Sequence, residues 1–436
     1  MSDSHKISFV SAVLMNINII VGSGIYLSPP LMAQQAGGLS FLGWILAGLL
    51  LLPIVLTIAN AARIFPGEGG FYNYCKAALG EDFGFIANWA YLLGYMGTVA
   101  TITSGIRDLL INPLGFNFIK EYPIVFYVFF ILIITLLNMI SIRVIGKIQS
   151  MITLLKLIPL LVMLGVIYFF WNSSFDYQID RISDLAGTIP LVLFSFLGFE
   201  SCCNIGHHIR GGTAQVFKVI LIAFSTSVLL YTVFHLGILQ IMGSVALASQ
   251  GVHAFPKFMG FSAVTSAIVS SFLLFDMMLS YMNTTYGAAL NNITNINIFA
   301  KCGLLFRSKF LSKLNASGMP SNAAIVHGIL IILLVTCVPS VTILVAITNL
   351  GVCIAFFLTI LAVFVQSLRK KKYSSLFIAS IGFISVGILI YLTWTTKLGD
   401  NNWTRLIHAS PIMIGIPVGF CMYRYSKKIK NCSVNK

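Results

Sequence analysis

The sequence predicts an all-α integral membrane protein with about 12 transmembrane helices. Of its 436 residues, 58% are hydrophobic and only 9% are charged, and the mean hydropathy is +0.94. Soluble domains carry about 25% charged residues, so this composition excludes an ordinary globular protein. Its apolar runs repeatedly reach the roughly 20 residues that cross the hydrocarbon core as a helix. Lipid offers the backbone no hydrogen-bond partner, so each span must pair its own groups as a helix.

Twelve apolar runs follow one another along the chain, separated by short polar connections. The longest connections cover residues 63–83 and 289–320, and neither is long enough to fold as a separate soluble domain. The predicted spans are 8–31, 40–62, 84–106, 122–141, 149–171, 186–208, 216–242, 261–288, 321–338, 342–367, 374–396 and 407–425.

The placement of the basic residues sets the predicted orientation. With the N-terminus in the cytoplasm, 20 of the 27 Lys and Arg residues fall on the cytoplasmic side, six fall outside, and Lys156 lies within a span. This bias follows the positive-inside rule and predicts a multi-pass protein of the inner (plasma) membrane with both termini cytoplasmic. The net charge of +15 then reflects topology and contact with membrane lipid, and we expect no nucleic-acid partner.

The cysteines predict neither a disulfide framework nor a cofactor. None of the eight lies in a predicted outer loop, and none shows the Cys/His spacing of a metal site. We therefore expect no metal and no cofactor.

Two spans are interrupted in the same way. Span 1 carries Gly22 and Gly24, and span 6 carries Gly198. Glycine loosens a helix interior, so unwinding is favoured at both places. The spans are five apart and therefore run in opposite directions, which predicts an inverted repeat of five plus five spans. The first repeat covers 8–171, the second covers 186–367, and two further helices cover 374–425. The alternative is that these small residues only permit close helix packing.

A broken helix has a defined chemistry. The second half of span 1 begins with unpaired amide groups, which Ser23, Gly24 and Ile25 would present to a carboxylate at the positive end of the helix dipole. The C-terminal end of a broken half-helix offers carbonyl groups that suit an ammonium. Together they predict a site for the head group of an α-amino acid.

Several motifs then match a known family. Residues 20–26 (Ile-Val-Gly-Ser-Gly-Ile-Tyr) resemble the span 1 signature of the amino acid–polyamine–organocation (APC) transporter superfamily. Residues 66–74 (Pro-Gly-Glu-Gly-Gly-Phe-Tyr-Asn-Tyr) resemble its loop after span 2, and residues 196–200 resemble its span 6. Asn138, with Gly146 and Gln149 before span 5, adds to an ordered set that fits over roughly residues 8–370.

The resemblance implies the APC fold with broken helices 1 and 6. It also implies secondary active transport of amino acids by alternating access, cationic amino acids and polyamines included, as a proton-coupled symporter or an amino acid/amine exchanger. The arginine/agmatine antiporter-like branch is the most similar. The partners expected are a small-molecule substrate and membrane lipid, and a homodimer is left open.

Site residues follow from the resemblance position by position. Ser23 and Gly24 correspond to the carboxylate-binding turn, Phe194 to an aromatic that stacks on or gates the substrate, and Tyr91 to a second gate residue. Each aromatic has packing as its alternative role. The full predicted substrate site is Val21, Gly22, Ser23, Gly24, Ile25, Tyr91, Phe194, Ser195 and Gly198.

Three charged residues lie within predicted spans, where an isolated charge costs at least about 2.5–3.5 kcal/mol. Lys156 resembles the lysine that sodium-independent members carry where relatives bind sodium, and it either releases a proton during the cycle or remains a fixed cation. Glu200 is expected to hydrogen-bond the unwound backbone or to relay a gate movement. Asp276 either faces the cavity, favouring a cationic substrate, or pairs with Lys156. These three form the predicted coupling set.

The sequence departs from the family after span 6, where it reads His207-His208-Ile209-Arg210. The two histidines either complete the helix end or respond to pH. No HExxH or GxSxG motif occurs, so no enzymatic activity is predicted. A nutrient sensor that binds the ligand without moving it is the remaining alternative to a transporter. Substrate identity and the coupling ion stay open.

Overall fold

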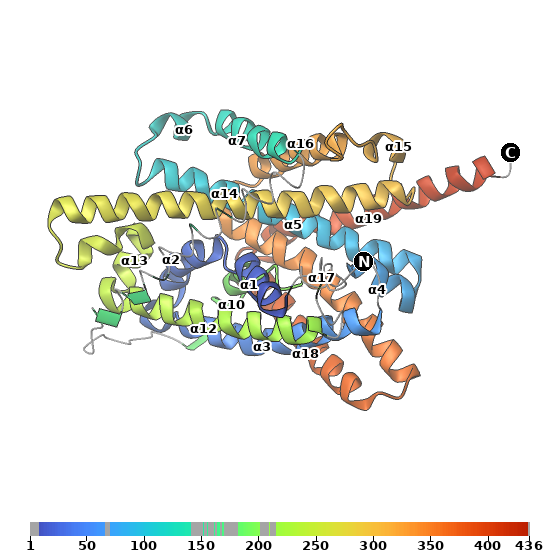
Figure 1. Ribbon diagram of the computed structural model, residues 1–436, viewed down its shortest axis with the longest axis horizontal. Helices are drawn as coiled ribbons and strands as arrows, with labels where there is room; N and C mark the ends of the chain where they lie inside the picture. Colours follow the sequence, from blue (N-terminus) through green and yellow to red (C-terminus); the bar gives the residue numbers. More distant parts are fainter. Residues whose placement is uncertain are drawn as a thin grey trace. The chain divides into compact units, whose positions relative to one another are not determined.

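The computed structural model describes residues 8–65, 70–140, 182–200 and 215–434, together with Ile209 and a few isolated positions between 151 and 169. The elements in these ranges are helices (Figure 1). Among the described residues, seven helices are long and apolar enough to cross a membrane, and one broken pair makes an eighth. Three shorter apolar helices cover Pro123–Leu137, Asp184–Phe196 and Ser321–Cys337. The prediction of an all-helical membrane protein is confirmed.

Internal contacts divide the chain into two compact units, each assembled from three stretches of sequence. The first unit comprises Met1–Gly70, Met151–Tyr281 and Val363–Leu392. The second comprises Phe71–Ser150, Met282–Ala362 and Thr393–Lys436. Each unit combines stretches from both halves of the chain. The five-plus-five inverted repeat stays a prediction.

The first unit is built around a broken helix. Its elements are α1 (Phe9–Ile20), α2 (Gly24–Ala36), η2 (Gly37–Leu39), α3 (Leu42–Ile64), α9 (Ile182–Ala186), α10 (Ile189–Phe196), α12 (Val216–Met242), α13 (Ser244–Gln250), η5 (Val252–Phe258), the first part of α14 (Ala263–Lys301), the end of α17 (Val341–Arg369), and most of α18 (Tyr373–Thr396). Helix α12 packs against α3 and α1, and α10 packs against α2 and α3 (Figure 1).

A buried tryptophan lies at the centre of the first unit. Trp44 of α3 is fully buried against the rings of Phe196 and Tyr231. Its indole Nε1 donates a hydrogen bond to Nδ1 of the buried His235 at 3.0 Å. The polar end of the ring is therefore satisfied while its apolar body fills the core, as large aromatic residues require.

The second unit contains long, unbroken helices. Its elements are α4 (Gly70–Leu79), α5 (Glu81–Ile111), α6 (Asn117–Glu121), α7 (Pro123–Leu137), the end of α14, α15 (Ser308–Leu311), α16 (Ser321–Cys337), most of α17 (Val341–Arg369), and α19 (Asn402–Val434). Helix α5 packs against α16 and α19, and α16 also packs against α7.

The prediction of a loop from residue 289 was wrong. Span 8 was expected to end at residue 288, whereas α14 continues to Lys301. The extension is polar enough to end a hydropathy run, but its buried residues Asn292, Ile296 and Phe299 recur at helical spacing. Asn292 is buried and its Nδ2 lies 3.3 Å from Nε2 of His327 on α16. The helical spacing of buried residues, rather than mean hydropathy, therefore indicates where α14 ends.

Candidate substrate-binding site

Span 1 is interrupted within the segment that the sequence indicated. Helix α1 ends at Ile20, α2 begins at Gly24, and their axes are bent by 45°. Within the turn, the amide of Gly22 donates to the carbonyl of Ile20 at 2.8 Å. These residues are only two apart in sequence, whereas an α-helix pairs residues four apart, so the helix is interrupted here. The prediction of a broken first span is confirmed.

The start of α2 has the features of an anion site. The amides of Tyr26 and Leu27 donate to the carbonyl of Ser23 at 3.2 and 3.0 Å. The amides of Gly24 and Ile25 belong to the first turn, for which an α-helix supplies no acceptor of its own. The turn is also screened from solvent, since Ser23 is 2% exposed and Ile25 is 1% exposed. A carboxylate bound there would meet the positive end of the helix in a low-dielectric environment.

Span 6 ends its first half beside this turn. Helix α10 ends at Phe196, and Gly198 follows with a φ of +111°, a conformation that side-chain-bearing residues rarely adopt. The amide of Gly198 donates to Oε2 of Glu200 at 3.0 Å. Glu200 therefore makes the hydrogen bond to unwound backbone that was one of its two expected roles. Its part in coupling stays a prediction, and residues 201–208, with His207 and His208, lie outside the described residues.

The two interrupted spans touch at small residues. A Cβ atom at Gly24 would lie 2.5 Å from Cβ and Oγ of Ser195 and 2.8 Å from its Cα. One turn further along α2, the hydroxyl of Ser28 lies 2.6 Å from that of Ser195. Only glycine at position 24 allows α2 and α10 to approach this closely.

Two side chains that the sequence analysis did not single out hold the broken ends together. The hydroxyl of Tyr231, on α12, lies 2.8 Å from the Ile20 carbonyl and 3.3 Å from that of Ser195, and it can donate to either. Asn16 of α1 donates from Nδ2 to the carbonyl of Phe199 at 3.4 Å. The signal available in the sequence was a polar group within an apolar span, since a buried hydroxyl or amide requires a partner.

Asp276 was expected either to face the cavity or to pair with Lys156, and the structure shows a third contact, with Tyr26. The hydroxyl of Tyr26, on α2, donates to Oδ2 of Asp276 on α14 at 2.6 Å, and both residues are buried. This bond ties the second half of span 1 to span 8. Lys156, the other expected partner, lies outside the described residues. The predicted coupling roles of Asp276 and Lys156 therefore stay predictions.

The two predicted gate aromatics belong to different units. Phe194 is buried in α10 of the first unit, one residue before Ser195. Tyr91 is buried in α5 of the second unit, where its ring lies 4.7 Å from that of Phe71 and its hydroxyl accepts a hydrogen bond from Asn291 at 3.2 Å. Their function as gates stays a prediction.

The described part of the chain shows no group of three or more His, Cys, Asp or Glu residues that could hold a metal ion. What the site offers a ligand is a helix N-terminus, carbonyl groups beside it and buried hydroxyls. Groups of these types can hydrogen-bond a carboxylate and an ammonium.

Comparison with known proteins adds independent information. A family model described as "Amino acid permease" matches residues 7–417. The serine/threonine exchanger SteT of Bacillus subtilis is 32% identical over 92 residues, which are 21% of this chain and 21% of the exchanger. The large neutral amino acids transporter small subunit 2 of Oryctolagus cuniculus is 34% identical over 112 residues, 25% of this chain and 21% of that protein.

An uncharacterized transporter of Mycobacterium tuberculosis is 33% identical over 102 residues, 23% of this chain and 19% of that transporter. In each case the aligned segment spans about a fifth of the relative.

Proposed function

The chain belongs to the amino acid permease family, and from this premise we propose that it is a secondary transporter that exchanges amino acids across the inner (plasma) membrane. The observation that carries the proposal is the break in span 1 between Ile20 and Gly24. The helix that follows the break, α2, begins in contact with Ser195 at the end of α10. Both broken ends lie in one compact unit, which supports their movement as a single body during alternating access.

The head group of the substrate binds at the break. Its carboxylate accepts hydrogen bonds from the amides of Gly24 and Ile25, and its ammonium donates to carbonyls at the ends of α1 and α10. Each charge-assisted hydrogen bond of this kind contributes about 1.5–3 kcal/mol. These groups are common to all α-amino acids, so the side chain must be selected elsewhere, with Phe194 and Tyr91 as the proposed gates.

A neutral amino acid is the favoured substrate. Two relatives are named as a serine/threonine exchanger and a large neutral amino acids transporter. A cationic substrate was inferred from Asp276, and the hydrogen bond from Tyr26 gives this carboxylate a structural role that needs no substrate charge. Lys156, Glu200 and Asp276 remain the proposed coupling residues, with proton symport as the alternative to exchange.

Uptake into proteoliposomes tests the proposal. A panel of radiolabelled neutral and cationic amino acids and polyamines is offered with unlabelled substrate inside, with an inward pH gradient, or with a sodium gradient. Exchange predicts uptake that requires internal substrate, whereas symport predicts uptake driven by the pH gradient. If a ligand binds the purified protein but none of the panel enters the liposomes, the chain is a nutrient sensor and the transporter proposal fails. Liposomes without protein serve as the control.

A further inference from the structure

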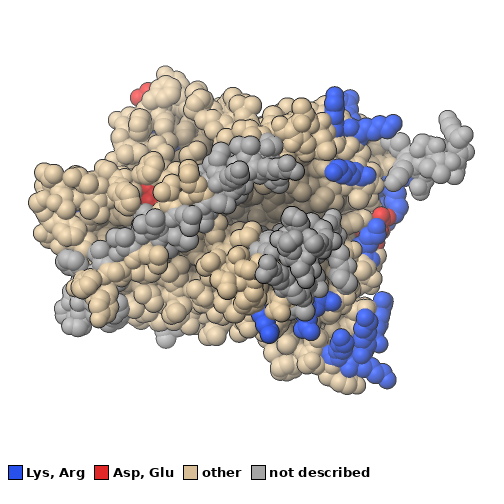
Figure 2. Space-filling view, in the orientation of Figure 1, with Lys and Arg blue, Asp and Glu red and all other residues tan. Residues whose placement is uncertain are grey.

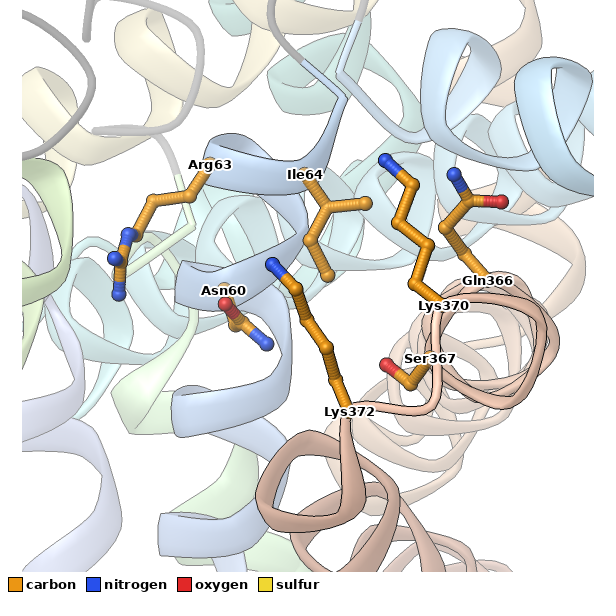
Figure 3. A pocket seen from close by; sticks show the side chains of 7 residues that line it. All are labelled: Asn60, Arg63, Ile64, Gln366, Ser367, Lys370 and Lys372. Carbon is orange, nitrogen blue, oxygen red and sulfur yellow. The ribbon is translucent and has the colours of Figure 1, made fainter.

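A basic cavity opens in the first unit, between the end of α3 and the turn that joins α17 to α18. Its volume is about 170 Å³. Figure 3 shows Lys370 and Lys372 extending from the turn toward α3, and Arg63 extending from the end of α3. The residues that line this basic cavity are Asn60, Arg63, Ile64, Gln366, Ser367, Lys370 and Lys372.

The lining is strongly positive. Its seven residues include three cations and no acid. None of the three forms an ion pair with another residue in the described part of the chain. The C-termini of α3 and α17 each bring about half a negative charge, which leaves a net charge of about +2. In the space-filling view, Lys and Arg gather over this turn at the lower right (Figure 2).

A buried hydroxyl also lines the cavity. Ser367 is only 1% exposed, and its Oγ has no hydrogen-bond partner among the described residues. Figure 3 shows this hydroxyl directed into the space between the turn and Asn60. Asn60, by contrast, donates from Nδ2 to Ser375 on α18 at 3.0 Å. Buried hydroxyls are nearly always paired, so an acceptor oxygen within the cavity accounts for the position of Ser367.

The backbone holds the two lysines in place. The amide of Lys372 donates to the carbonyl of Ser367 at 2.9 Å, and that of Lys371 donates to Leu368 at 3.2 Å. This is the hydrogen-bond pattern of a Schellman turn, and Lys371 takes the left-handed position with a φ of +51°. The turn therefore fixes the directions in which Lys370 and Lys372 leave the backbone.

We propose that the basic cavity binds a phosphate-bearing anion. The three cations neutralise its charge and Ser367 donates a hydrogen bond to one of its oxygens. A single water needs about 10–15 Å³ of such space, so the volume admits a tetrahedral anion. The same phosphate chemistry is presented by the head group of an anionic lipid and by a soluble phosphate, and the experiment separates the two sources. The site is independent of the proposed transport site.

The test measures the thermal stability of the full-length protein in a neutral detergent. Dioctanoyl-phosphatidylglycerol, dioctanoyl-phosphatidylcholine and inorganic phosphate are titrated separately. The cavity triple variant is Arg63→Gln/Lys370→Gln/Lys372→Gln. The matched control, Lys301→Gln/Lys309→Gln/Lys313→Gln, removes the same charge from exposed residues that do not line the cavity. Ser367→Val removes the hydroxyl and fills the space. If the cavity triple variant does not fold, the same titrations on Ser367→Val test the proposal.

Phosphatidylglycerol is expected to raise the Tm of the wild-type protein in a saturable way. Each cation increases the affinity for an anionic lipid about fivefold. Removing all three should therefore raise the half-saturating concentration of phosphatidylglycerol about a hundredfold in the cavity triple variant. It should rise about fivefold in Ser367→Val and stay within about threefold in the control. The same pattern with inorganic phosphate alone assigns the site to a soluble anion. Equal losses in both triples, equal protection by phosphatidylcholine, or no protection by either anion overturns the proposal.

Discussion

In the second unit, Gly94 and Gly351 lie at the contact between two unbroken helices, α5 and α17. In the first unit, Gly24 is instead the first residue of α2 and contacts the end of α10. Both contacts are tight. A Cβ at Gly351 would lie 2.6 Å from the amide nitrogen of Gly94, and one at Gly24 would lie 2.5 Å from Cβ of Ser195. The two glycines nevertheless differ in their backbone. Gly351 lies inside the continuous helix α17, whereas Gly24 lies in the first turn of α2, where backbone amides have no acceptor within the helix.

The difference separates the two interpretations of small residues in a membrane span. Close packing alone explains Gly351, because both helices run through the contact without a break. It explains only part of the first unit, where Gly24 allows contact and also stands among the amides that open the second half of span 1. Glycine content therefore does not identify a site unless it coincides with a helix end.

The largest effect is expected from Gly351→Ala. The new methyl group would meet main-chain atoms of Gly94 and Ala90, at 2.6 and 2.7 Å, and backbone cannot rotate away as a side chain can. We expect a loss of about 3 kcal/mol or more in stability, at the upper end of overpacking effects. A fall in Tm and in the yield of monodisperse protein measures it. Wild-type stability in this variant would show that α5 and α17 can separate, and would break the comparison.

The next effect is a loss of transport in Gly24→Ala. The methyl group would push α2 away from Ser195 and displace the amides at the start of α2. We expect initial uptake rates to fall about thirtyfold, equivalent to about 2 kcal/mol. Cβ and Cα of Ser195 cannot rotate away, so the two helix ends must shift, and we expect the variant to fold with a lowered Tm.

The double variant Gly24→Ala/Ser195→Gly is the control for that result. It removes the colliding Cβ and Oγ and should recover part of the lost uptake, although the bond between Ser28 and Ser195 is also lost. If uptake does not recover at all, the loss in Gly24→Ala arises from something other than this contact.

The sequence predicted those features that depend on local backbone chemistry. The break near Gly22 and Gly24, the irregular backbone at Gly198 and the hydrogen bond of Glu200 to that backbone all follow from residues close together in the chain. The spans within the described residues follow as well, because hydropathy is a property of contiguous residues, whereas span 5 (149–171) lies almost entirely outside the described residues.

Contacts between distant segments were not predictable. Tyr26 and Asp276 are 250 residues apart, and Tyr231 is 211 residues from Ile20. Periodicity places each residue on a helix face but does not tell which helix that face meets. The extension of α14 to Lys301 was missed for a different reason, since a polar helix end lacks the hydropathy that defines a span.

A smaller effect is expected when the bond between Tyr26 and Asp276 is removed. Tyr26→Phe leaves the packing unchanged and deletes a 2.6 Å hydrogen bond to a carboxylate, which contributes about 1.5 kcal/mol or more. We expect uptake to fall about tenfold for all substrates alike, because α2 is less firmly held. A change confined to one class of substrate would show instead that Tyr26 contacts the substrate side chain.

Asp276→Asn separates charge from structure at the same position. The amide oxygen can still accept the Tyr26 hydrogen bond, so a purely structural role predicts a loss smaller than that in Tyr26→Phe. A cationic preference predicts, in addition, a shift in the ratio of cationic to neutral uptake. An unchanged ratio removes the hypothesis that Asp276 selects a cationic substrate.

The smallest effect is expected from Gly387→Ala, the matched counterpart of the first variant. Gly387 lies in the middle of α18, and a Cβ there would meet nothing within 4 Å. Alanine favours the helix over glycine by about 1 kcal/mol, so the Tm should rise slightly or stay unchanged, and uptake should be unaffected. Because the substitution is identical to that in Gly351→Ala, the difference in Tm between the two variants measures the close contact itself. A clear destabilisation in Gly387→Ala would mean that added methyl groups harm these helices wherever they fall, and the distinction between packing glycines and the glycines at the break would lose its basis.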